Sequence, residues 1–252
     1  MAPHKFTLVV GHPYCDDMSK RTKYLLAVVI AAAVLLVGGP WVYINLIKDD
    51  APEELSLDSS TDTSVATQPS DTIQQSPATD DVSGTWTISK ESVVGYRVKE
   101  VLFGQDTEGV GRTSQVTGSL TIADNSVTAA EFTVDMATIE SDSGKRDDQF
   151  RGRIMDTSTY PTATFTLTSP IALPDSATSG TEFTVDATGD LALRGTTKSV
   201  TFPLEAQLTG SGVRVAGKIN VVFADWSIPN PGFGGITTED NGDLEFLLTF
   251  SR

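Results

Sequence analysis

The stretch "EFTVDATGDLALRG", residues 182–195, decides the fold of this chain. Every second residue from Phe183 to Leu193 is apolar or glycine, and polar residues occupy most of the positions between them. The side chains of a β-strand point alternately to its two faces, so this period predicts a long strand with one buried face. Arg194 and Gly195 then begin a short turn.

The same alternation recurs along the chain from residue 84 to residue 250. It is present in "GTWTIS" (84–89), "VVGYRV" (93–98), "QVTGSLTI" (115–122), "AEFTVDM" (130–136), "ATFTLT" (163–168), "VTFPLEAQL" (200–208), "VRVAGKINVVF" (213–223) and "LEFLLTF" (244–250). Short connections with Gly, Asn or Asp separate many of these segments, as in hairpins. The prediction is an all-β domain of antiparallel strands, a sandwich or a barrel, because closure buries the apolar faces and removes the edges.

The interior of such a barrel decides its function. An eight-stranded barrel is either filled by its own side chains or holds one small ligand. Gly118, Gly189 and Gly217 all fall on the apolar face. They are expected either to bend long strands or to leave room inside for a guest.

One charged segment interrupts the alternation: "KRDDQFRGRIMDTSTYPTATF", residues 145–165. Phe150 and Ile154 are four positions apart, which places them on one face of a helix. The prediction is a short amphipathic helix that packs against one end of the barrel. Asp147 and Asp148 are not expected to form a catalytic pair, because adjacent helical side chains diverge and alternating Arg and Asp usually form a solvated ion-pair face.

The N-terminal region predicts a single-pass membrane anchor. The segment Tyr24–Ile47 contains no charged residue and is long enough to cross a bilayer as a helix. Basic residues precede it and acidic residues follow it, so residues 1–23 are predicted as a cytoplasmic tail and the barrel as extracytoplasmic. The predicted location is the cell membrane. A cleaved signal peptide is the alternative.

Residues 48–83 are rich in Ser, Thr, Asp and Pro. Such a segment buries too little apolar surface to offset the entropy of ordering, so it is predicted as a disordered acidic linker. O-glycosylation of its hydroxyl residues is an alternative role. The folded domain then covers residues 84–252.

Composition excludes several kinds of function. The formal net charge is −15, which argues against a nucleic-acid partner. Cys15 is the single cysteine, so no intrachain disulfide can form. His4 and His12 are the only histidines, and residues 84–252 contain neither His nor Cys, which removes the common nucleophile and zinc-ligand sets. No catalytic residue, no metal site and no enzyme activity are predicted.

Several of these motifs together resemble the YceI-like family. They are "GTWTIS" and "SVVGYRV", then "VTGSLTI", "RDDQFRGRIMDTSTYPTATF" and "GDLALRGTTKSVTFPLEA", in this order across residues 84–250. The resemblance implies an eight-stranded lipocalin-like barrel of the bacterial cell envelope, with the charged segment as a helical insert at its end. It also implies that the bore holds a polyisoprenoid chain, so the only bound group expected is an isoprenoid quinone or a polyprenyl lipid. The sequence departs from the family in "YRVKE", which has no His, and in a long, glycine-rich loop, "FGQDTEGVGRTS" (103–114).

The apolar faces then supply the candidate ligand-binding residues, which are Tyr96, Phe132, Val134, Met136, Phe165, Phe183, Leu191, Phe202, Val221 and Phe223. A packed barrel that serves as an envelope-stress or surface interaction module, with no ligand, is the alternative. The long loop Ile228–Gly242 is expected to be either a mobile lid that carries Phe233 or a connection anchored to the barrel. Assembly into a homodimer is left open.

Overall fold

The computed structural model describes residues 20–42, 51–58, 82–102, 104–177, 180–209 and 212–252. The chain divides into two compact units, Met1–Asp49 and Asp50–Arg252. The first contains helix α1 (Lys20–Val42), which overlaps most of the predicted anchor. Residues 43–47 of that anchor and residues 1–19 lie outside the described part. Among the described residues, no helix has the length and apolar character needed to span a bilayer.

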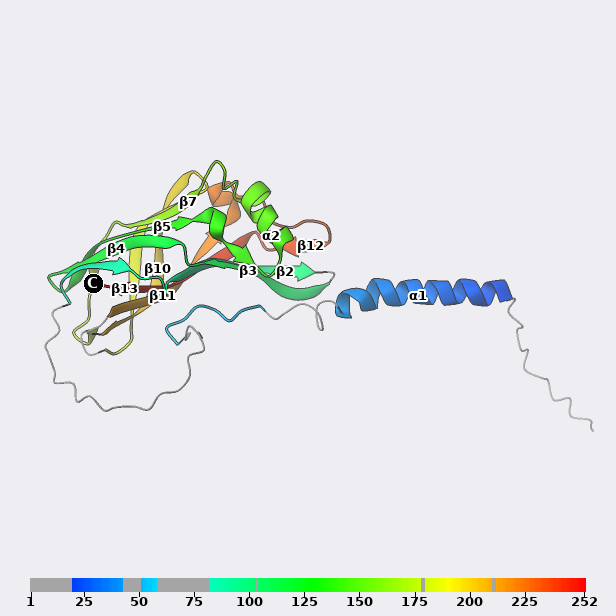
Figure 1. The fold of residues 1–252 in the computed structure, drawn as a ribbon, viewed down its shortest axis with the longest axis horizontal. Coiled ribbons are helices and arrows are strands. Elements are labelled where there is room, and N and C mark those ends of the chain that lie inside the picture. Colours follow the sequence, from blue (N-terminus) through cyan, green and yellow to red (C-terminus); the bar gives the residue numbers. More distant parts are fainter. Residues whose placement is uncertain (1–19, 43–50, 59–81, 103, 178–179, 210–211) are drawn as a thin grey trace, which may run out of the picture. The chain divides into compact units, whose positions relative to one another are not determined.

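The second unit is a closed barrel (Figure 1). Eight strands pair with their neighbours, all antiparallel, and the pairing of the last with the first completes the ring. In ring order they are β1 (Gly84–Ile88), β4 (Val116–Ala123), β5 (Ser126–Asp135), β7 (Thr162–Leu167), β9 (Phe183–Leu193), β10 (Thr196–Thr209), β11 (Gly212–Val222) and β13 (Asn241–Ser251). The prediction of an eight-stranded antiparallel barrel is confirmed.

Five further strands extend the wall. They are β2 (Val93–Leu102), β3 (Gln105–Thr113), β6 (Glu140–Ser141), β8 (Ile171–Ala172) and β12 (Ile236–Thr238). β2 follows β1 after a short break and pairs with β13, β12 and β3. β3 pairs in turn with β6, and β8 pairs with β5. The wall is therefore longer on the side of β2 and β3.

The prediction of a loop at residues 103–114 is wrong, because most of this segment is β3. β3 pairs with β2 from Gln105 to Thr113. Its glycines reflect close packing: a Cβ added at Gly111 would lie 2.5 Å from Cε1 of Tyr96. Glycine at this position lets the Tyr96 ring lie directly against the neighbouring strand.

The apolar faces predicted from the alternation are the faces that point into the barrel. Trp86, Leu120, Leu191, Phe202 and Phe250 are all buried in one core cluster. Because strand parity has a period of two, one correct residue fixes the orientation of its neighbours as far as the next irregularity. Such an irregularity in the pairing of β4 with β5 lets both Val127 and Ala130 face the interior.

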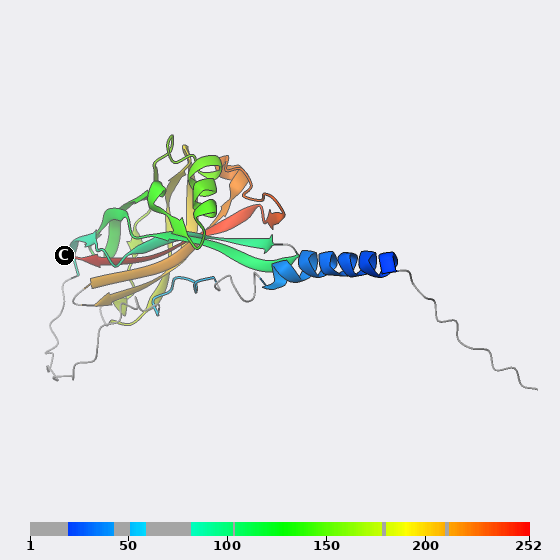
Figure 2. The ribbon, with the colours of Figure 1, turned by 45° about the vertical axis from the view of Figure 1, so that its right-hand side comes forward.

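Short helices close one end of the barrel. They are η2 (Met136–Thr138), α2 (Gly144–Gln149), η3 (Phe150–Ile154) and η5 (Phe223–Trp226), and β12 lies beside α2 (Figures 1 and 2). We call this the helix end. The opposite end, where β4 leads into β5 and β11 begins, is the hairpin end.

The predicted insert is confirmed as helical and docked. Phe150 and Ile154 are buried, and the Phe150 ring stacks on Tyr96 with 5.0 Å between centroids. Asp148 is exposed as expected. Asp147 is instead buried, and its Oδ1 accepts hydrogen bonds from the backbone N–H and the hydroxyl of Ser141. The predicted solvated ion-pair face is therefore wrong for Asp147.

Residues 51–58 cross the outside of the barrel, and we call them the strap. Leu57 is only 4% exposed and packs against Ala216 and Leu247, which point outward from β11 and β13. Leu55 packs against the same small cluster. The predicted disordered linker is therefore wrong for residues 51–58, and its residues 48–50 and 59–81 lie outside the described part of the chain.

A cluster of charged side chains lies beside the strap on the outer wall. Nε of Arg97 donates to Oε2 of Glu245 at 3.3 Å, and Nη2 of Arg112 donates to Oε1 of the same carboxylate at 2.8 Å. Arg97 also donates to the carbonyl oxygen of Pro52 at 2.6 Å, and Arg112 donates to that of Glu53. The strap thus accepts hydrogen bonds from two arginines that share one buried carboxylate.

Candidate functional site: an apolar cavity in the barrel

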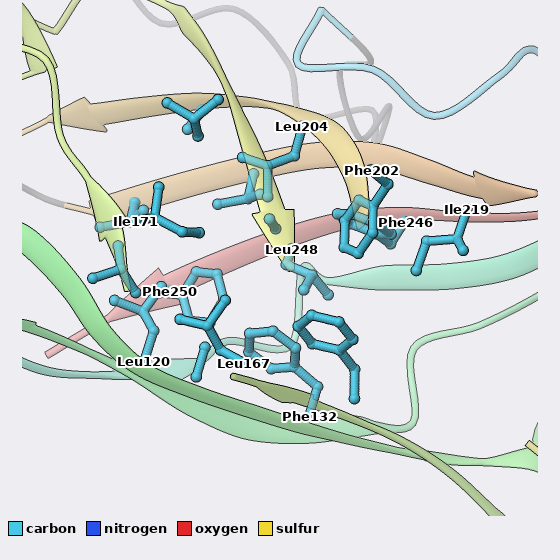
Figure 3. A pocket seen from close by; sticks show the side chains of 18 of the residues that line it. Leu120, Phe132, Leu167, Ile171, Phe202, Leu204, Ile219, Phe246, Leu248 and Phe250 are labelled. Carbon is cyan, nitrogen blue, oxygen red and sulfur yellow. The ribbon is translucent and has the colours of Figure 1, made fainter. Parts of the chain in front are cut away.

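An apolar cavity of about 120 Å³ lies inside the barrel (Figure 3). Among the residues that line it, Thr164 is the only polar one. The lining includes Val94, Leu120, Ile122, Phe132, Val134, Phe165, Leu167, Ile171, Phe183, Leu191, Phe202, Leu204, Leu208, Ile219, Phe246, Leu248 and Phe250. No charged side chain of the described residues belongs to the wall, so the cavity suits a hydrocarbon group.

Five phenylalanine rings form a continuous series along this wall. Phe250 contacts Phe132 with 5.7 Å between centroids, and Phe132 stacks on Phe165 at 6.3 Å. Phe165 meets Phe202 edge-on at 5.5 Å, and Phe202 meets Phe246 at 5.9 Å. These separations fall in the range that aromatic pairs favour. The rings therefore support one another while each also faces the cavity.

The glycines on the apolar face accommodate these rings. Gly118 pairs directly with Phe132, and Gly217 pairs with Phe246. A Cβ added at Gly189 would lie 2.4 Å from Cζ of Phe165. The expectation that these glycines leave room for a guest is therefore wrong, because a ring or neighbouring backbone already occupies the space above each one.

The structure divides the ten predicted ligand-binding residues into two groups. Six of them line the cavity: Phe132, Val134, Phe165, Phe183, Leu191 and Phe202. The other four, Tyr96, Met136, Val221 and Phe223, are absent from its wall and lie in or next to the packing of the helix end. That the first six contact a ligand stays a prediction.

Several lining residues were missed. Leu120, Leu204 and Leu248 share the parity of the predicted residues, so alternation alone could have identified them. Ile171 lies on the two-residue strand β8, which is too short for a period to be visible. The lining toward the hairpin end was therefore under-predicted, and the helix end was over-predicted.

Partial exposure distinguishes many lining residues from an ordinary core. Phe132, Phe165, Phe183, Leu167 and Leu204 are only partly buried, although they point into the barrel. In a close-packed interior such large side chains have almost no accessible surface. Their remaining surface is apolar and is available to a bound group.

The polar groups near the bore gather at the helix end. Arg146 donates to Oε1 of Glu100 at 2.9 Å and also pairs with Asp142. Burial disfavours the charged form of Arg146, but these two carboxylates more than offset it, and the pKa of the guanidinium rises. Burial raises the pKa of the nearby Tyr96 hydroxyl, with Arg146 acting in the opposite direction. Tyr96 therefore remains neutral beside a fixed positive charge.

Comparison with known proteins agrees with this geometry. The model of the YceI-like domain family matches residues 86–250. A polyisoprenoid binding domain from Saccharophagus degradans, implicated in plant cell wall breakdown, is similar with a TM-score of 0.54 and 18% identity, covering 68% of this chain and 99% of that one. Burkholderia cenocepacia BcnA is similar with a TM-score of 0.50 and 20% identity, over 64% and 98% of the two chains. No curated protein sequence matches.

The eight-stranded ring, the helical insert and the apolar bore define a lipocalin-like barrel. Because the family match covers nearly the whole barrel, the chain belongs to the YceI-like domain family. The two solved structures, at these identities, show the shared fold.

Proposed function

We propose that this protein binds a polyisoprenoid or another long apolar lipid, such as the tail of an isoprenoid quinone, inside the barrel. The observation that carries the proposal is the cavity, whose wall is apolar apart from Thr164. The similar domain from Saccharophagus degradans is described as polyisoprenoid binding, which supports the same ligand class here. The proposed activity is binding and not catalysis.

The cavity is smaller than a chain of several prenyl units, so binding requires the lining side chains to move. A cavity of about 150 Å³ lined by Leu, Ile and Phe holds a benzene molecule, and the volume here is about 120 Å³. A chain of several prenyl units is longer, so the partly buried lining side chains must change rotamer to admit it. Each square ångström of apolar surface that the ligand buries contributes about 25 cal/mol, and no polar contact is needed for affinity.

We further propose that the protein acts at a cell membrane. The uncharged segment Tyr24–Ile47 is the candidate anchor, with Lys20, Arg21 and Lys23 before it and acidic residues after it. This distribution of charge supports a cytoplasmic N-terminus and an extracytoplasmic barrel. A tethered barrel of this kind would hold its lipid close to the bilayer.

Native mass spectrometry of the full-length protein, purified in mild detergent, tests the ligand. The expected result is an added mass that organic extraction releases and that fragments as a prenyl lipid. Protein that carries no lipid, and that takes up none when incubated with a prenylated quinone, would support the packed interaction module instead.

Protease protection tests the location separately. Protease added to intact cells is expected to release the barrel and to leave a short membrane-bound fragment. A soluble mature protein whose N-terminus lies between residues 40 and 50 would establish a cleaved signal peptide.

A further inference from the structure

Three large apolar side chains of the barrel unit are exposed among the described residues, and all belong to the helix end. Phe233 is 69% exposed, Val222 is 42% exposed and Val101 is 37% exposed. Phe233 precedes β12, which pairs with β2 at Val101, and Val222 is the last residue of β11 before η5. Exposed apolar side chains that lie close together mark interaction surfaces, whereas single ones are ordinary. The pairing of β12 with β2 brings Phe233 and Val101 to the same edge of the wall.

The turn that carries Phe233 is closed by hydrogen bonds. Phe233 and Ile236 exchange two backbone hydrogen bonds of 3.1 Å around Gly234 and Gly235, whose φ angles are both positive, as a tight hairpin requires. From η3, Arg153 donates to the carbonyl oxygens just before this turn, at 3.0 and 2.9 Å. Of the two interpretations of the long loop, these contacts favour the anchored connection, and the Phe233 ring is exposed to solvent.

The direction of the strap shows where the chain enters the barrel unit. Pro52 is bonded to Arg97, whose partner on β13 is Asp243, whereas Leu57 packs on Leu247. β13 runs from the helix end to the hairpin end, so the strap runs in the same direction. Its first residue, Ala51, therefore points toward the helix end.

Only three residues, 48–50, separate the candidate anchor from the strap. Three extended residues span no more than about 11 Å. Because the strap is bound to the barrel, only residues 48–50 of the predicted linker remain between the candidate anchor and the barrel unit. The chain enters the barrel unit at the helix end, which is also the end that exposes Phe233.

We propose that the helix end docks on the surface of the bilayer, with Phe233 and Val101 inserted among the lipid headgroups. This inference rests on the membrane attachment proposed above. Glu239 and Asp240 follow β12 in the same loop, so the segment that carries Phe233 offers apolar and acidic side chains but no basic one. The partner is the apolar boundary of a neutral bilayer, where amphipathic surfaces bury aromatic and aliphatic side chains.

A depth measurement with the full-length chain tests this docking. In a Cys15→Ser background, Phe233→Cys receives an environment-sensitive fluorophore, and the protein is reconstituted into phosphatidylcholine vesicles with brominated acyl chains. Lys90→Cys, an exposed site beside Gly212 at the hairpin end, is the matched control. We expect a blue shift and quenching for the probe at position 233, and neither change for the probe at position 90.

The outcomes separate the docking from the anchor. Protein that sediments with the vesicles but shows no quenching at position 233, or equal quenching at both sites, overturns the docking and leaves the anchor intact. Protein that does not sediment with the vesicles overturns both. Leu57→Asp, which should release the strap, is expected to lower the quenching at position 233 while sedimentation is retained, whereas the exposed neighbour Asp58→Ser should change neither. Unchanged quenching in Leu57→Asp would contradict the orienting role of the strap.

Discussion

The two halves of the barrel differ in how completely their side chains fill the interior. Toward the helix end the interior is packed, since Tyr96 stacks on Phe150. The surface there is held by hydrogen bonds from η3 to the Phe233 loop and from Arg97 to the strap. Around the phenylalanine series the same barrel keeps an apolar cavity and partly exposed side chains. The empty volume is therefore local: it lies among the phenylalanine rings, whereas the helix end is filled by its own side chains.

The largest effect should come from the charges beside the strap. The side chains of Glu245 and Arg97 are 4% and 7% exposed. Burial disfavours the charged form of Arg97, but its bonds to Glu108 and Glu245 outweigh this and raise its pKa. Glu245→Ala leaves that charge without its buried partner, which should lower the free energy of unfolding by about 3 to 5 kcal/mol.

Urea melts of the full-length protein measure this loss. Glu205→Ala, on the exposed face of β10, is the control and should cost less than about 0.5 kcal/mol. Equal, small effects of the two changes would mean that the strap and its arginines do not stabilise the barrel.

The helical insert should come next. Phe150 is buried against Tyr96, so Phe150→Ala should lower the free energy of unfolding by about 3 kcal/mol through the lost contacts and the cavity left behind. Asp148→Asn, on the exposed side of the same helix, should change it by less than about 0.5 kcal/mol. If both variants melt like the wild type, the helix end is not rigid and the comparison fails.

A smaller effect is expected at the glycines. Gly189→Ala places a methyl group 2.4 Å from the Phe165 ring and 2.5 Å from the carbonyl oxygen of Thr166, so overpacking should cost about 1 to 3 kcal/mol. Gly152→Ala meets no atom within 4 Å and should be neutral or slightly stabilising. Thermal melts measure the difference between the two variants. If Gly189→Ala melts at the same temperature as the wild type, the space above Gly189 is free after all.

The smallest expected effect is a pH dependence at Tyr96. Burial raises the pKa of its hydroxyl in the folded state, whereas the same hydroxyl in the unfolded chain has a pKa of about 10. Above that pH the unfolded state holds fewer protons, so this group removes up to about 1.4 kcal/mol of stability per pH unit. Tyr96→Phe should flatten the fall of stability above pH 10 by that amount. Identical slopes for the two proteins would show that Tyr96 is accessible to solvent.

Much of the barrel could be predicted from the sequence, because alternation depends on local geometry. The parity of Phe132, Leu191 and Phe202 follows directly from the period of two, and so does the face that each strand buries. β3 could not be recognised, since its glycines remove the apolar signal that marks a strand. Gly111 leaves space for the ring of Tyr96, which packs against it from the neighbouring strand. A contact between two strands is not visible in the local sequence pattern of either one.

The strap and the limits of the cavity were hidden for a related reason. In the strap only Leu55 and Leu57 are large and apolar, and their partners Ala216 and Leu247 lie on a face that alternation assigns to solvent. The extent of the cavity depends on rotamers, so parity could not separate Phe165, which lines it, from Phe223, which packs at the helix end. The sequence therefore predicts toward which face of the strand a side chain points, but only tertiary packing determines whether that side chain lines the cavity or contacts another element.

A matched pair of variants on β5 tests the central claim most directly. Ala130 is partly buried and lines the cavity, whereas its neighbour Ala129 is exposed on the other face of the strand. Binding of a prenylated quinone is followed by quenching of tryptophan fluorescence, with thermal melts to confirm folding. Ala130→Phe should keep the fold and weaken binding by about tenfold or more, equivalent to about 1.4 kcal/mol, while Ala129→Phe should bind like the wild type. Equal binding by both folded variants, or no binding by the wild type, would contradict a lipid site inside the barrel.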